Sequence, residues 1–124
     1  MKSGGILNAA LCHAIGSLGH GDGLLVTDAG FPIPAGANRI DLAVARDLPD
    51  LRTVLGLIGD ECIVEAITVA EEVPQNNPEL DEWLTARWPR AERSTVPHSE
   101  LLATGAARAK FVVRTGAFEP WGNV

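Results

Sequence analysis

The segment from Gly23 to Asp28 constrains the fold most, because it is a short, continuous run of apolar, strand-forming residues that ends in an acid. Such a run is typical of a strand buried on both faces, as the strands of parallel sheets are. Further strand-like segments follow, and helical patterns lie between them. The expected strands are residues 23–28, 39–43, 63–70, 94–96 and 111–114, and the expected helices are residues 9–18, 51–58, 77–88 and a segment from about residue 99. This alternation predicts a three-layer α/β domain with a mainly parallel central sheet.

Local signals mark the ends of these helices. Asn8 is placed to cap the first helix, and Gly19 is the residue expected just past its end. Gly59 is expected to end the second helix in the same way. Pro78 suits the first turn of the third helix, and Pro89 stops it.

Length and composition limit the class of protein. A chain of 124 residues predicts one domain that covers residues 1–124, and 46% hydrophobic with 21% charged residues is ordinary globular composition. The net charge of −6 and the scattered lysines and arginines argue against a nucleic-acid-binding face. No apolar run approaches the ~20 residues of a membrane span, and the N-terminus lacks the pattern of a signal peptide. Cys12 and Cys62 cannot form a disulfide framework, so we expect a cytoplasmic, reducing location.

Polar residues at the strand ends are the first candidates for chemistry. In an open parallel sheet, ligands bind beyond the carboxyl ends of the strands. This rule selects Asp28, the pair Glu71–Glu72 and His98, while His20 and Asp22 lie in the glycine-rich loop before the first strand. Each has a simpler interpretation. A histidine after a helix can serve as a cap, an aspartate at a strand end can order the next turn, and a histidine before a helix can be solvated.

Residue spacing argues against several other kinds of site. The glycines from Gly16 to Gly23 do not form a phosphate loop, because a helix precedes them and a strand follows, the reverse of the required order. The histidines have no metal-ligand spacing, although the fold could still bring two of them together. The composition allows a nucleophilic triad, but there is no Gly-x-Ser-x-Gly nucleophile turn. What remains is a pair of histidines with a carboxylate and no expected cofactor or metal. That set suits proton transfer on a small polar molecule.

Eight short motifs in one order resemble the D-ribose pyranase family, a resemblance that extends over nearly the whole chain. The L-fucose mutarotases are its near sibling branch, and the segments 31–34 and 39–41 are more similar to the ribose branch. The motifs are Gly5–Asn8, Leu18–Asp22, Asp28–Pro34, Arg39–Ala43, Val64–Ala66, Ala70–Glu72, Asn77–Pro78 and Val113–Gly116.

The resemblance implies an activity, an assembly and a set of site residues. Members of this family interconvert the pyranose and furanose forms of a free sugar without a cofactor. They form homo-oligomers, typically pentameric rings stacked as decamers, with sites at the subunit interfaces. The implied proton donor is His20, and the implied sugar-binding residues are Asp28, His98, Trp121, Gly122 and Asn123.

General acid–base chemistry agrees with His20 as the donor. Opening a cyclic hemiacetal removes a proton from the anomeric hydroxyl and delivers one to the ring oxygen. An ordinary histidine titrates near ~6.5 and an ordinary aspartate near ~4, so a histidine both gives and takes protons at neutral pH. Asp28 then binds sugar hydroxyls or orients the histidine, and the base is His98, Asp28 or a water. The alternatives are a mutarotase for another free sugar, such as L-fucose, and a non-catalytic sugar-binding accessory protein.

Two departures from the family bear on the site. Trp121 stands where the family usually has tyrosine, which keeps a stacking surface and loses a hydroxyl. The chain stops at Val124, where relatives continue with one more short apolar strand. We expect that strand to anchor the loop at 121–123 in those relatives.

Overall fold

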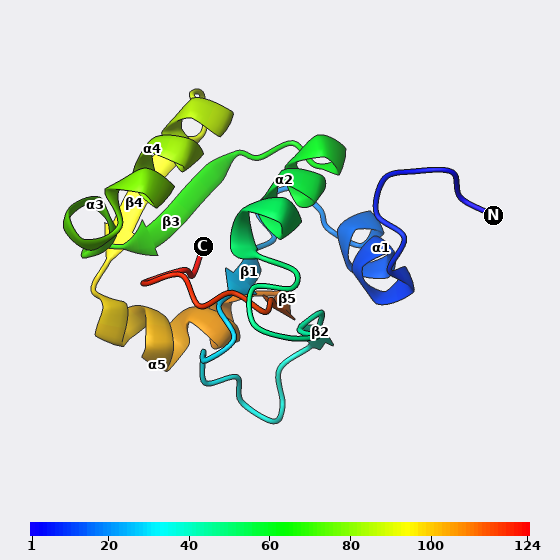
Figure 1. Ribbon diagram of the computed structural model, residues 1–124, viewed down its shortest axis with the longest axis horizontal. Coiled ribbons are helices and arrows are strands. Elements are labelled where there is room, and N and C mark those ends of the chain that lie inside the picture. The colour runs from blue at the N-terminus through cyan, green and yellow to red at the C-terminus, as the bar shows by residue number, and fades with distance from the viewer.

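Two parallel sheets form the centre of the molecule (Figure 1). The computed structural model describes residues 1–124. The first sheet has the order β1-β5-β2, with β5 in the middle, and the second pairs β3 with β4. The strands are β1 (Leu24–Thr27), β2 (Arg39–Asp41), β3 (Ala66–Ala70), β4 (Glu92–Val96) and β5 (Phe111–Arg114). The helices are α1 (Ala9–Gly16), α2 (Leu51–Glu61), α3 (Val73–Asn76), α4 (Pro78–Arg87) and α5 (His98–Arg108).

The α/β class and the parallel pairing of the strands are confirmed. The pairing differs from the expectation in one respect, because the strands divide between two sheets instead of forming one central sheet. In Figure 1 the pair β3 and β4 lies beside α3 and α4, away from β1, β5 and β2. The C-terminal segment, drawn in red, runs between the two groups. One cluster of 22 buried apolar residues joins them.

The middle strand of the first sheet is buried as a parallel strand should be. Val112 and Val113 of β5 are fully buried, and Val113 lies opposite both Val26 of β1 and Ile40 of β2. The chain end extends this sheet, since Val124 exchanges two backbone hydrogen bonds with Val26, of 2.8 and 2.9 Å. This contact helps to hold the last residues against the carboxyl end of β1.

Side-chain caps begin three of the helices. Asn8 accepts from the backbone N–H of Leu11 at the start of α1, as predicted, and Asp50 does the same for α2. Asn77 caps α4 with a 3.2 Å bond from the N–H of Leu80. Caps of this kind stabilise a helix by about 1 kcal/mol.

The predicted ends of α1 and α2 are wrong, and α3 was not predicted. α1 stops at Gly16, short of Leu18. α2 continues through Gly59 to Glu61, although a glycine usually marks a helix end. The physical reason is packing, because a Cβ at Gly59 would lie 2.3 Å from the indole of Trp88. That glycine lets an aromatic ring rest on the helix and does not terminate it. None of the helices combines the length and apolar character needed to cross a membrane.

Candidate active site

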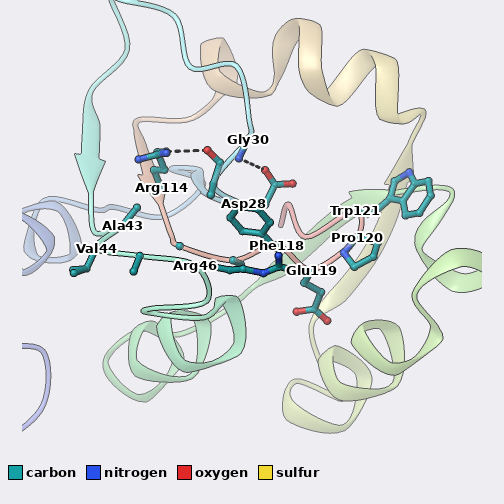
Figure 2. Close-up of a pocket in the computed structure, with 14 residues that line it drawn as sticks. Asp28, Gly30, Ala43, Val44, Arg46, Arg114, Phe118, Glu119, Pro120 and Trp121 are labelled. Atoms are coloured by element: carbon teal, nitrogen blue, oxygen red, sulfur yellow. Dashed lines mark hydrogen bonds between the residues drawn. The ribbon is translucent and has the colours of Figure 1, made fainter.

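A cavity of about 580 Å³ opens at the carboxyl ends of β1 and β5. Its walls come from the loop after β1, from residues 43–46 and from the segment 116–121 that follows β5. Figure 2 shows the Asp28 carboxylate beside the Phe118 ring, with the Trp121 indole beyond Pro120. The structure therefore places Asp28 and Trp121 at one cavity, which lies where the rule for parallel sheets expects a ligand.

Asp28 and Asn123 hold each other through two hydrogen bonds. The Asn123 amide Nδ2 donates to Asp28 Oδ2 at 3.0 Å, and Asp28 N–H donates to Asn123 Oδ1 at 3.1 Å. Asn123 is almost fully buried, whereas Asp28 is half-buried. Asp28 Oδ1 also accepts from the N–H of Gly30 at 2.8 Å. The sequence predicts both residues as sugar ligands, and the structure brings them together across 95 positions of the chain.

Arg114, at the end of β5, fixes the loop that follows Asp28. Its Nε donates to the carbonyl of Ala29 at 3.0 Å, and its Nη1 pairs with Asp41 at 3.1 Å. Gly116 is required two residues later, because a Cβ there would lie 2.4 Å from a backbone carbonyl. Arg114 lines the cavity but was not predicted as a site residue. The only signal for it was its place in one of the eight motifs.

His98 lies beside Trp121. The centroids of the two rings are 6.4 Å apart, in an edge-to-face arrangement at 67°. His98 Nδ1 is buried and has no hydrogen-bond partner within the chain. The backbone N–H of His98 donates to Glu72 Oε2 at 3.1 Å, which places the start of α5. By sequence, Glu72 is one of a pair of candidate glutamates at a strand end.

His20 belongs to a different cavity, of about 820 Å³, between the loop 19–23, α2, β3 and α5. Its Nδ1 lies 2.7 Å from Glu65 Oε1, and 95% of the His20 side chain is exposed. The hydrogen bond from His20 lowers the pKa of Glu65, aided by a bond from the backbone of Gly21. By sequence, Asp28 is a carboxylate expected either to bind sugar hydroxyls or to orient His20. The structure gives this place to Glu65, which lies within the 64–66 motif.

A second ion pair shapes the loop that carries His20. Asp22 Oδ2 accepts from the N–H of Gly19 at 2.8 Å and from Lys110 Nζ at 2.7 Å. The bond from Lys110 lowers the pKa of Asp22, and the bond from Gly19 adds to this. Gly21 has φ of +78°, a conformation that glycine adopts without strain. Asp22, a candidate by sequence, therefore orders the His20 loop.

The site residues predicted by resemblance thus fall into two groups on one chain. Asp28 and Asn123 bond to each other, and Trp121 shares a cavity with Asp28 and a ring contact with His98. His20 lies before β1, whereas Asp28 lies after it. The strand alone separates Leu24 from Asp28 by roughly 13 Å at about 3.3 Å per residue. No cluster of three or more histidine, cysteine, aspartate or glutamate side chains is arranged to hold a metal ion.

The fold and this cavity define an α/β protein with a candidate site at the carboxyl ends of parallel strands, where the Asp28 carboxylate lies among polar and apolar side chains. The chain belongs to the RbsD / FucU transport protein family, whose family model matches residues 1–124. It is 62% identical over its whole length to D-ribose pyranase 1 of Streptomyces griseus, covering 82% of that protein. It is 53% identical to D-ribose pyranase 2 of Rubrobacter xylanophilus, of which it covers 80%.

A solved structure supports the same relationship. The structure of Bacillus subtilis RbsD complexed with D-ribose matches this fold with a TM-score of 0.91 and 34% sequence identity. The match covers 99% of this chain and 93% of that one.

Proposed function

We propose that the protein is a D-ribose pyranase, which opens the ring of free D-ribose and recloses it to interconvert the pyranose and furanose forms. The observation that carries this proposal is the full-length similarity to proteins named D-ribose pyranase, at up to 62% identity. The close fold match to RbsD with D-ribose bound supports the substrate. The Asp28 carboxylate lines an open cavity and is held in place by the buried Asn123, so it can accept hydrogen bonds from sugar hydroxyls.

Ring opening requires two proton movements and one bond cleavage. A base removes the proton of the anomeric hydroxyl, the bond from the anomeric carbon to the ring oxygen breaks, and an acid protonates that oxygen. Attack by a different hydroxyl on the free aldehyde then closes the other ring size. Acid–base assistance typically contributes 10²–10⁴-fold, which suits a reaction that already occurs in water. No cofactor or metal is needed for these steps.

His20 is the proposed proton donor, and its contact with Glu65 determines which imidazole nitrogen faces the substrate. The 2.7 Å contact to Glu65 occupies Nδ1. A histidine held in this way carries a proton on Nδ1 and presents Nε2 for exchange with the substrate. Asp28, His98, Trp121, Gly122 and Asn123 are the proposed sugar-binding residues.

The proposed site requires two copies of the chain, because His20 and Asp28 lie at opposite ends of β1. We propose that a homo-oligomer, as pentameric rings or a decamer, brings His20 of one subunit to the Asp28 cavity of another. Exposed apolar side chains at the rim of that cavity support a subunit contact there. Val44, which is 79% exposed, and Phe118, which is 57% exposed, both line it.

Saturation-transfer NMR on D-ribose tests the activity directly. Wild-type protein should accelerate exchange between the pyranose and furanose anomeric signals, and His20→Ala should abolish the acceleration. His13→Ala is the matched control, because His13 is an exposed histidine of α1 that makes no side-chain hydrogen bond. Unchanged exchange in His20→Ala would refute the role of His20. Ribose binding without acceleration would favour a sugar-binding accessory protein, and acceleration with L-fucose alone would favour the sibling branch.

Co-expression of two inactive variants tests the shared site. His20→Ala and Asp28→Ala each lack one group, but a site formed between the two variants can take Asp28 from the first and His20 from the second. Partial recovery of exchange in the mixed oligomer is therefore expected. If mixing restores nothing while mixed oligomers form, the shared site is wrong.

The proposed location is the cytoplasm. Both cysteines, Cys12 and Cys62, are free thiols in the folded chain, which suits a reducing compartment. Burial raises the pKa of the Cys62 thiol, with a smaller contribution from the charge of Glu61, so this thiol is less prone to ionise than an exposed cysteine.

A further inference from the structure

We propose that Asn77 is a positioning residue for the sugar site, because its side-chain amide holds the turn that carries Trp121 and Asn123. The inference rests on the proposed sugar-binding role of that turn. Asn77 lies between α3 and α4, far in sequence from residues 119–123, and makes no contact with the cavity itself.

The hydrogen-bonding groups of the Asn77 side chain are all in use. Its Oδ1 accepts from the N–H of Leu80, which caps α4. Its Nδ2 donates to the carbonyl of Pro120 at 2.9 Å and to Glu119 Oε1 at 3.1 Å. The residue is 8% exposed, so these bonds form largely out of water, where an unmade bond is costly.

Glu119 also connects the turn to a second helix, α2. The Oε1 atom that accepts from Asn77 also accepts from Arg52 Nη2 of α2, at 2.5 Å. Glu119 is 19% exposed and Arg52 is 33% exposed, so the pair is only partly solvated. The turn is therefore fixed between α2 and α4, while residues 119–121 of the turn line the cavity.

The turn needs this support because its backbone is tight. Trp121 has φ of 52°, in the left-handed region that residues other than glycine rarely adopt. The N–H of Gly122 donates back to the carbonyl of Glu119 at 3.1 Å, and a Cβ on Gly122 would lie 2.9 Å from that oxygen. A strained conformation persists only where the surroundings hold it.

The residue type at position 77 distinguishes two roles, capping α4 and holding the turn at residues 119–123. Aspartate, serine and threonine cap helices about as well as asparagine does, because each supplies an oxygen. Only asparagine among them also offers two N–H donors to the opposite side. The helix alone therefore does not require asparagine here, whereas the turn does.

The test uses Asn77→Asp, which keeps the shape and the capping oxygen but replaces the donor with a carboxylate facing Glu119. The matched control is Asn8→Asp, since Asn8 caps α1 through a 2.9 Å bond and has no link to the turn. We expect KM for D-ribose to rise roughly tenfold or more in Asn77→Asp, with kcat within about twofold, because a lost binding group acts on affinity. Asn8→Asp should keep the wild-type KM.

A spectroscopic signal makes the test independent of activity. In protein labelled with 5-fluorotryptophan, the fluorine resonance of Trp121 should shift or broaden in Asn77→Asp, while those of Trp83 and Trp88 stay in place. Asn77→Ser, which caps without adding charge, should give the same change and guards against poor folding of the aspartate variant.

Three results would overturn the proposal. The first is a wild-type KM and Trp121 resonance in both variants. The second is a loss of thermal stability alone, which would make Asn77 only a helix cap. The third is a fall in kcat at constant KM. Failure of the proposed function would be distinct, since wild-type protein would then show no exchange while the Trp121 resonance still reported the turn.

Discussion

Replacing Asn123 with alanine should cost about 2–4 kcal/mol in the free energy of unfolding. The side chain is 1% exposed and makes two bonds to Asp28. A hydrogen bond to a charged group contributes about 1.5–3 kcal/mol, and a neutral one about 0.5–1.5 kcal/mol. The variant leaves the Asp28 N–H and one Asp28 carboxylate oxygen without their partner. The sum of one charged and one neutral hydrogen bond therefore gives the expected loss of about 2–4 kcal/mol.

Urea denaturation at a fixed protein concentration is the appropriate assay, because an oligomer's apparent stability depends on concentration. Asn38→Ala is the matched control. Asn38 also loses one side-chain bond, from Nδ2 to the carbonyl of Lys110 at 2.9 Å, but at an exposed position. It should cost less than about 1 kcal/mol. If Asn123→Ala costs no more than Asn38→Ala, the Asp28–Asn123 pair does not hold the chain end, and the reasoning fails.

His20→Ala should raise the pKa of Glu65 back toward its ordinary value, because the hydrogen bond from His20 is the main cause of its depression. A carbon-detected NMR titration of the Glu65 carboxyl measures this, and an unchanged pKa would contradict the contact. The depressed pKa means that the His20–Glu65 pair stabilises the fold above the ordinary glutamate pKa and that this stabilisation is lost as pH falls through the depressed value. Two glycines of α2 should respond oppositely to alanine in a urea titration. In Gly56→Ala no atom lies within 4 Å of the new Cβ, so the free energy of unfolding should rise by about 0.5–1 kcal/mol. In Gly59→Ala the new Cβ lies 2.3 Å from the Trp88 indole, so the free energy of unfolding should fall. A rise in both variants would show that Trp88 moves freely aside.

Apart from the short helix α3, the order of the helices and strands could be predicted from the sequence, because the formation of each depends on neighbouring residues. The run at 23–28 contains β1, and residues 111–114 form β5 as expected. The division into two sheets could not be read, because strand pairing depends on contacts between distant segments. Gly59 shows the same limit at one residue, since nothing near it in sequence indicates that Trp88 will pack there.

The same limit applies to the candidate site, where individual residues could be predicted but their contacts could not. Resemblance named Asp28 and Asn123, but their mutual bonds span 95 positions and follow only from the fold. The supporting residues Glu65 and Arg114 were missed as site residues, because a charged residue in a motif does not reveal its partner. Glu72 was predicted as one of a pair of candidates at a strand end, but its bond to the backbone of His98 follows only from the fold. Asn77 was visible only as a helix start, and its second role depends on Pro120 lying against it.

The exposure of His20 connects the proposed chemistry to the proposed assembly. An ion pair such as His20–Glu65, with side chains 95% and 52% exposed, is weak in water and holds the imidazole loosely. The same pair becomes stronger when a protein surface covers it, because the local dielectric falls. A second subunit at this loop would therefore bring the Asp28 cavity to His20 and also exclude the water that weakens its contact with Glu65. On this reasoning, proton transfer by His20 should be slow in a lone chain and should become faster when the proposed oligomer forms.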